Sequence, residues 1–134
     1  MDKEMRITFK GNKRVDAEYK GFTIQTDQPI HQGGDGTAPA PFDYFLTSLG
    51  TCAGYYIIPF CQSRGIPTDN ITVTLRTEVN PELRKITKVV IEANLPSDFP
   101  EKYTKALVRA MESCAVKKYI ESPFEMETLA TIEK

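Results

Sequence analysis

The longest stretch without a charged side chain runs from Tyr44 to Ser63, and it decides what this chain can fold into. Its apolar side chains recur at helical spacing and form one stripe: Phe42, Phe45, Leu46, Leu49, Ala53, Tyr56, Ile57 and Phe60. The opposite side carries a second apolar set: Tyr44, Cys52, Tyr55 and Ile58. A helix that is apolar nearly all round is buried nearly all round. We therefore expect a long, buried central helix that begins near Pro41 and ends at Arg64 and Gly65.

A membrane span is the alternative interpretation of this stretch, because ~20 apolar residues are enough to cross a bilayer. Ser, Thr, Gly, Gln and Pro occupy many of its positions, so its mean apolarity is low for a span. We favour a core helix of a soluble protein with no membrane partner.

The length and the charge of the chain limit its domain number and the kinds of partner it can bind. A chain of 134 residues predicts a single domain over 1–134. Residues 1–67 carry seven basic and seven acidic side chains, and residues 68–134 carry ten and eleven, so there is no basic stripe for a nucleic acid. The first residues have the wrong composition for a signal peptide, and we expect a cytoplasmic protein.

The sequence on either side of the central helix alternates between strand and helix patterns. Alternating apolar residues predict strands over 5–9, 15–19, 22–26, 71–75, 89–95 and 124–128. A glycine-rich loop over 27–37 matches no phosphate-binding motif and is interpreted as a flexible connection. An amphipathic helix follows Ser97 or Asp98, and Ser113 could end it, so that residues 114–120 form a separate short helix. The order predicts an α+β fold with antiparallel sheets.

One chain offers little surface to cover such a helix. Six strands and one amphipathic helix leave part of an all-round apolar helix without a partner. A second copy of the chain would supply the missing surface, so we expect a homodimer with a mostly apolar interface.

The cysteines are the candidates for chemistry. Cys52, Cys61 and Cys114 show no C-x-x-C spacing, and His31 is the only histidine, which argues against a zinc site, a Ser-His-Asp triad or any other metal or cofactor. Cys52 and Cys114 both fall on apolar helix faces. They are either small core residues or a redox pair, in which Cys52 is oxidised by a peroxide and Cys114 condenses with the product. A reactive Cys52 would need a cation or hydrogen-bond donor from elsewhere in the fold.

Two segments resemble a known family. The run GGDGTAPAPFDYFLTSLGTCAGYY over 33–56 and the segment ESCAVKKYI over 112–120 are similar to the OsmC (osmotically inducible protein C) family, which includes the organic hydroperoxide resistance proteins. The resemblance extends over the whole chain. It implies an intertwined homodimer with two sites at the interface and thiol-dependent reduction of hydroperoxides, organic ones above all, with an external dithiol as reductant.

The resemblance also implies roles for single residues. Cys52 matches the cysteine that attacks the peroxide, and Cys114 matches the resolving cysteine. Arg14 is the nearest match to an arginine that activates the thiolate. Where active members carry a glutamate, this chain has Phe42, with Asp43 as the nearest carboxylate. This departure suggests a divergent subgroup. The alternatives are a non-enzymatic protein that binds an apolar or acyl ligand, and a thiol redox sensor. Cys61 has no role in the family.

Overall fold

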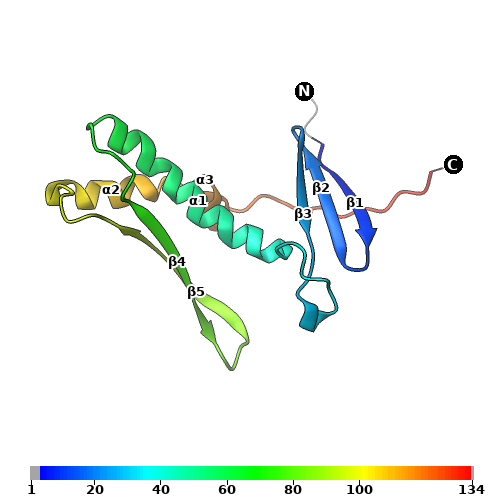
Figure 1. The fold of residues 1–134 in the computed structure, drawn as a ribbon. Coiled ribbons are helices and arrows are strands. Elements are labelled where there is room, and N and C mark those ends of the chain that lie inside the picture. The colour runs from blue at the N-terminus through cyan, green and yellow to red at the C-terminus, as the bar shows by residue number, and fades with distance from the viewer. Residues whose placement is uncertain (1–3, 134) are drawn as a thin grey trace. The chain divides into compact units, whose positions relative to one another are not determined.

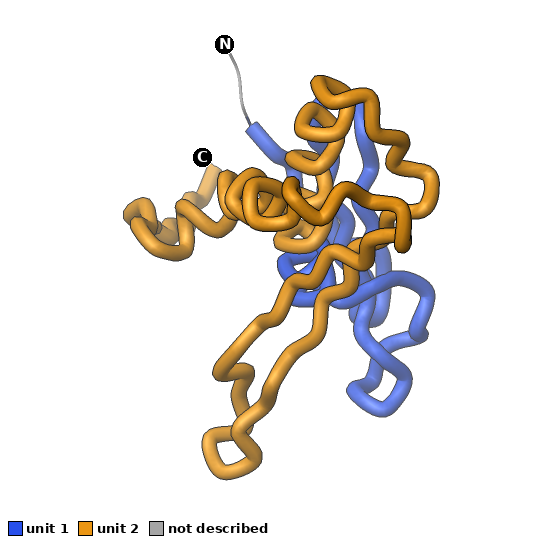
Figure 2. Tube along the Cα trace, turned by 90° about the vertical axis from the view of Figure 1, so that its left-hand side faces the viewer, with its two compact units in different colours: residues 1–47 blue, residues 48–134 orange. Residues whose placement is uncertain are grey.

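The computed structural model describes residues 4–133 and shows the α+β class that the sequence predicts (Figure 1). The chain divides into two compact units, Met1–Thr47 and Ser48–Lys134, which Figure 2 colours separately. Each unit is described by itself. The expectation of a single domain over 1–134 stays a prediction.

Unit 1 is built on the three-stranded meander that the alternation predicts. The strands β1 (Arg6–Gly11), β2 (Arg14–Tyr19) and β3 (Phe22–Thr26) form one antiparallel sheet in the order β1-β2-β3. The register aligns an apolar row, Ile7, Ala17 and Ile24, and beside it a polar row, Thr8, Asp16 and Gln25. Because neighbouring positions of a strand face opposite sides, the sheet has one apolar and one polar face.

A buried carboxylate orders the glycine-rich loop that follows β3. Asp27 is fully buried, and its carboxylate accepts hydrogen bonds from the Gln28 N–H (2.7 Å), the Thr37 N–H (3.0 Å) and the Thr37 hydroxyl (2.7 Å). The loop contains the short helix η1 (Ile30–Gln32). At Gly34 the backbone lies so close to the Gln28 carbonyl that a Cβ atom would clash with its oxygen. The loop is therefore closed on itself by fixed contacts.

The expected central helix is present as α1 (Pro41–Gln62). Its buried residues are Leu49, Ala53, Ile57, Phe60 and Cys61. Four larger side chains remain exposed: Phe42, Phe45, Tyr55 and Ile58. One chain therefore buries a single side of α1 and leaves the rest uncovered, as expected for one copy alone; the second copy that would cover it stays a prediction. Within residues 4–133, no helix has both the length and the apolarity that crossing a membrane requires.

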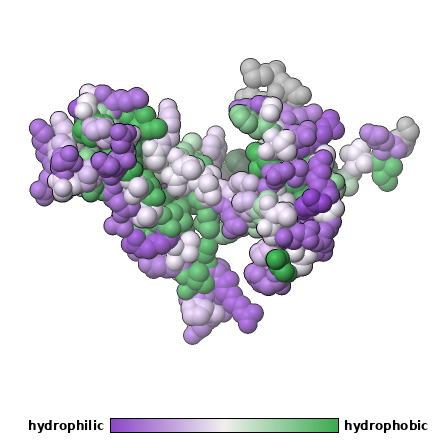
Figure 3. Space-filling view, in the orientation of Figure 1, coloured by the Kyte–Doolittle hydropathy of each residue, from purple (hydrophilic) through white to green (hydrophobic). Residues whose placement is uncertain are grey.

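Unit 2 packs helices against a hairpin. The strands β4 (Thr72–Asn80) and β5 (Lys85–Asn94) pair in antiparallel register, as predicted. The core contains buried residues of α1, of the loop after β5 and of α2 (Thr104–Met111): Ala53, Ile57, Phe60, Cys61, Phe99, Leu107 and Met111. Val73 and Ile91 of the hairpin pack against this cluster. Figure 3 shows apolar side chains on the surface along α1 and the hairpin as well.

The second helical region is interrupted where Ser113 predicted a break. A short turn, η2 (Glu101–Tyr103), leads into α2, and α3 (Ala115–Glu121) begins anew with Cys114 as its N-cap. The start of this region was predicted too early. The Phe99 N–H donates to the Pro96 carbonyl in a turn (3.0 Å), and the helical residues begin only after Pro100.

The prediction of a last strand over 124–128 is wrong for the described residues of a single chain. Residues 123–133 form neither helix nor strand, and their apolar side chains are exposed: Phe124, Met126, Leu129 and Ile132. A strand needs a neighbour for its N–H and C=O groups, and none of the described strands pairs with this segment. The alternation alone could not supply that neighbour.

Candidate functional site

The structure brings Cys52 and Cys114 together inside unit 2. Cys52 lies half-buried in the middle of α1, and Cys114 is 2% exposed at the junction between α2 and α3. The Cys114 thiol donates a hydrogen bond to the Cys52 sulfur. Both thiols are free. The two cysteines that sequence reasoning singled out are therefore in direct contact.

The start of α3 supplies the donors around this pair. The N–H groups of the first turn of a helix have no partner inside the helix. Those of Ala115 and Val116 donate to the Cys52 sulfur, and that of Lys117 donates to the Cys114 sulfur at 3.4 Å. The break at Ser113 thus turns three free N–H groups toward two sulfur atoms.

These contacts move the two thiol pKa values in opposite directions. Burial acts to raise the pKa of Cys52, but the Cys114 thiol and the N–H groups of Val116 and Ala115 outweigh it and lower the pKa below its ordinary value. The pKa of Cys114 is raised, first by burial and then by its hydrogen bond to Cys52, against the Lys117 N–H. Cys52 is therefore the more acidic thiol of the pair, and Cys114 is the less acidic one that donates to it.

Cys61 stands apart from this arrangement. It is fully buried in the core of unit 2, and burial raises its pKa, although the positive charge of Arg64 acts in the opposite direction. The Arg64 guanidinium lies over the Phe60 ring, 3.7 Å from its centre, and donates to the Phe60 carbonyl at 3.0 Å. Cys61 is a core residue, and Arg64 covers the end of α1.

The two other predicted site residues lie in unit 1. The Arg14 Nη2 atom donates to the Lys10 carbonyl at 3.0 Å, and the rest of the side chain is exposed. The Asp43 carboxylate accepts the Ala40 N–H at 3.0 Å and so stabilises the first turn of α1. Their roles toward Cys52 stay predictions. Phe42, at the position of the expected glutamate, is exposed and contacts the Phe45 ring at a centre-to-centre distance of 5.5 Å.

Sequence reasoning missed the backbone donors of Ala115 and Val116. The sequence predicts a cation or a hydrogen-bond donor near Cys52, but the one residue that it offers for this role is a side chain, Arg14. The signal was the pair Ser113 and Cys114 inside a helical pattern, because a new helix start there leaves N–H groups free.

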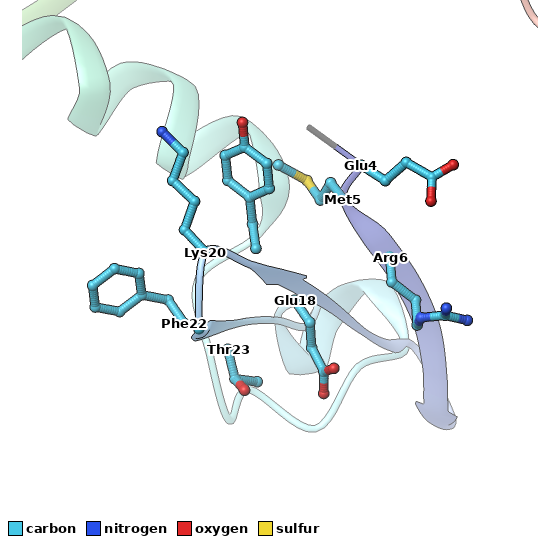
Figure 4. A pocket seen from close by; sticks show the side chains of 9 residues that line it. Glu4, Met5, Arg6, Glu18, Lys20, Phe22 and Thr23 are labelled. Carbon is cyan, nitrogen blue, oxygen red and sulfur yellow. The ribbon is translucent and has the colours of Figure 1, made fainter. Parts of the chain in front are cut away.

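A separate hollow of about 700 Å³ opens at one end of the sheet of unit 1 (Figure 4). Its walls combine charged and apolar side chains, among them Glu4, Arg6, Glu18, Lys20 and Phe22. No cysteine lines it. The thiol chemistry therefore belongs to the junction of α1 with α3 and not to this hollow.

Comparison with known proteins decides the family. A family model described as "OsmC-like protein" matches residues 34–128, which include both cysteines of the pair. The chain belongs to this family. A search of the curated proteins finds no match for this OsmC-like chain.

Solved structures show the same fold. A putative osmotic stress induced and detoxification response protein from Psychrobacter arcticus is 24% identical, with a TM-score of 0.71 and 85% of each chain covered. An organic hydroperoxide resistance protein OsmC from Legionella pneumophila is 19% identical, with a TM-score of 0.59, and the match covers 87% of this chain and 88% of that one.

A putative organic hydroperoxide resistance protein from Vibrio cholerae, with captopril bound in one of its active sites, is 17% identical. Its TM-score is 0.60, and the match covers 90% of this OsmC-like chain and 85% of that one. At these identities the comparisons establish the fold of this chain.

Proposed function

We propose that this OsmC-like protein is a thiol-dependent hydroperoxide reductase. The observation that carries the proposal is the hydrogen bond from the Cys114 thiol to the Cys52 sulfur. This hydrogen bond joins Cys52, a thiol of lowered pKa, to Cys114, a second thiol in direct contact. A peroxide-reducing cysteine pair needs these two groups. Cys52 is also the more exposed of the two, so a peroxide meets it first.

The reaction proceeds in three balanced steps. The Cys52 thiolate attacks the terminal oxygen of the hydroperoxide, the O–O bond breaks, and the alkoxide takes a proton and leaves as an alcohol. Cys114 then attacks the sulfur of the Cys52 sulfenic acid, and water leaves as the disulfide forms. An external dithiol reduces the disulfide by exchange and is itself oxidised to a disulfide. No metal or cofactor takes part in this scheme.

The N–H groups of Ala115 and Val116 hold the Cys52 sulfur through the first step. They are backbone groups, so their positions are fixed by α3 and not by side-chain rotamers. They favour the negative charge that the attacking sulfur carries. The hydrogen of the Cys114 thiol gives the sulfur a third donor.

The proposal includes Arg14 as a further positive charge toward the thiolate, Asp43 as the carboxylate that orients it, and a homodimer that completes the site. Arg14 is exposed, and its guanidinium has further N–H groups beside the one that donates to the Lys10 carbonyl, which supports an approach to a substrate or a second chain. The exposed apolar residues of α1 and of the segment 123–133 support the dimer, because such surface is normally covered. Arg14→Gln should slow peroxide reduction by about tenfold, as expected for loss of one charge-assisted contact, whereas Arg6→Gln should not.

The deciding experiment counts thiols and weighs the intact protein before and after one equivalent of cumene hydroperoxide. Formation of the disulfide removes two hydrogens, so the mass should fall by about 2 Da with the loss of two thiols. Cys52→Ser should show no change in either quantity. Cys114→Ser should gain about 16 Da, because its sulfenic acid has no thiol to condense with.

The same experiment distinguishes the reductase from the alternatives. Unchanged thiols in the unmodified protein would contradict the proposal. Formation of the disulfide without repeated turnover when dithiothreitol is added would identify a thiol redox sensor instead of a reductase. A peroxide-dependent loss of Cys61, with Cys52 and Cys114 intact, would also overturn the assignment.

A second candidate function rests on the aromatic start of α1. Phe42 replaces the expected glutamate, and the exposed Phe42 and Phe45 rings lie together. Such a surface suits an apolar or acyl ligand. Native mass spectrometry of the freshly purified protein, with added dodecanoic acid, tests this function. Absence of both a resident ligand and uptake would eliminate it.

A further inference from the structure

Asp16 is a buried carboxylate without a partner. It lies on β2 and is 8% exposed. Within residues 4–133, its side chain takes part in no hydrogen bond or ion pair. Directly opposite on β1 is Thr8, whose hydroxyl oxygen is fully buried and has no hydrogen-bond partner in the described part of the chain, whereas the Asp16 carboxylate keeps a small opening to solvent. Buried charges are normally paired, so this polar row lacks a component that a ligand could supply.

The polar row borders a cavity. A pocket of about 350 Å³ is lined by Lys10, Arg14, Asp16, Gln25, Thr26, Thr37 and Ala38, all of them in unit 1. Lys10 and Arg14 bring positive charge to a wall that also contains the Asp16 carboxylate. Arg14 donates to the Lys10 carbonyl and leaves Asp16 unpaired. The pocket thus offers two positive side chains and one carboxylate, with no ion pair between them in the described part of the chain.

The rim of the pocket is ordered before any ligand binds. Thr37 is fixed by its two hydrogen bonds to Asp27, at 3.0 Å from the N–H and 2.7 Å from the hydroxyl. The Thr26 hydroxyl donates to the Val15 carbonyl at 2.5 Å. Because these side chains are already held, binding would cost little additional ordering.

The charges restrict the class of ligand. A simple cation attracted to Asp16 would be repelled by Lys10 and Arg14, and a simple anion would leave Asp16 unpaired. We propose that this pocket binds a small amino-acid-like zwitterion, with its ammonium group on Asp16 and its carboxylate on Lys10 and Arg14. The cavity volume lies in the range of small-molecule sites. This site goes beyond the proposed thiol chemistry; it shares Arg14 with that proposal, and its test therefore rests on Asp16, which the thiol chemistry does not use.

The test is a titration of the full chain with small-molecule probes, and ¹⁵N–¹H NMR spectra monitor the binding. The probes are L-alanine, L-glutamine and L-phenylalanine, with acetate and methylammonium as single-charge probes. At least one amino acid should bind about tenfold or more tightly than either single-charge probe, with shifts at Thr8, Asp16 and Gln25. Asp16→Asn should weaken that binding by about tenfold or more, because it removes the charge-assisted hydrogen bond.

Glu18→Gln is the matched control, since it removes the same charge from an exposed position of the same strand outside this pocket. It should leave binding unchanged. Without ligand, Asp16→Asn should raise the melting temperature, because an unpaired buried charge is removed. Failure of all three amino acids to bind would overturn the proposal. A lower melting temperature for Asp16→Asn would do so too, because it would show that the chain itself supplies the partner of Asp16. Both readouts are independent of Cys52.

Discussion

Cys52 and Cys61 occupy the same helix and have opposite properties. They are nine positions apart, so they lie about 180° apart around a helix with 3.6 residues per turn. Cys61 faces the core and is fully buried, and its pKa is raised. Cys52 is half-buried beside α3, and its pKa is lowered. The helix that carries both residues therefore does not determine their reactivity.

The difference lies in the number of donors that each sulfur receives. Burial acts to raise the pKa of both thiols, but only the pKa of Cys61 is raised as a result. Cys52 receives three hydrogen bonds that favour its thiolate, whereas Cys61 has only the charge of Arg64. Fixed donors thus outweigh burial at one position and not at the other.

Replacing each cysteine by serine tests this comparison, and the loss of activity in Cys52→Ser is the largest effect that we expect. Cys52→Ser should reduce hydroperoxide consumption by roughly hundredfold or more, because the covalent nucleophile is lost. Cys61→Ser should leave consumption nearly unchanged, although a buried hydroxyl without a partner costs about 1–3 kcal/mol of stability. A ferrous-xylenol orange assay measures the rates, and urea unfolding measures the stability. Equal losses of activity in two folded variants would break the comparison.

The side-chain donor to Cys52 can be removed while the two backbone donors stay in place. Cys114→Ala deletes the thiol that donates to Cys52, whereas Cys114→Ser keeps a donor and an N-cap for α3. Both variants lose the resolving thiol. The pKa of Cys52 should rise in Cys114→Ala, because one hydrogen bond to the charged sulfur is lost, and it should rise less in Cys114→Ser.

The pH dependence of iodoacetamide alkylation measures that pKa. Because a lowered pKa keeps the thiolate present at lower pH, the alkylation profile of the unmodified protein should lie on the acid side of both variants. Identical profiles for Cys114→Ala and Cys114→Ser would show that the backbone N–H groups alone set the pKa of Cys52.

The sequence predicted much of this fold and part of this site. Alternation predicted the meander and the hairpin, and the uncharged run predicted α1, because these patterns report a local period. The segment 123–133 has the same alternation and forms no strand, since pairing depends on a neighbour that the pattern does not contain. The cysteine pair was predicted through the family resemblance. The N–H donors of Ala115 and Val116 were not, because backbone groups leave no residue type to recognise. Asp27 gave no signal either.

Asp27 extends the comparison to unit 1 with the smallest expected effect. Burial raises its pKa, but the Thr37 hydroxyl and the N–H groups of Thr37, Gln28 and Asp35 lower it to about 2, so donors outweigh burial here as they do at Cys52. A depressed carboxyl pKa stabilises the fold above the unfolded value near 4 and loses that contribution as the pH falls toward 2.

Thr37→Val removes the hydroxyl, which is the largest of these contributions, and leaves the N–H groups in place. The pKa of Asp27 should rise, and stability at pH 7 should fall, because the charged carboxylate loses a donor. Acid unfolding should therefore begin at a higher pH than in the unmodified protein, and the stability difference between the two proteins should shrink as the pH falls below the unfolded value near 4. ¹³C NMR of the carboxyl group measures the pKa, and circular dichroism follows the unfolding. Asp35→Asn keeps the backbone N–H of that residue and serves as the control. An unchanged Asp27 pKa in Thr37→Val would mean that the backbone donors alone overcome burial. Asp27 would then differ from Cys52, where a side-chain donor is expected to contribute to the lowered pKa.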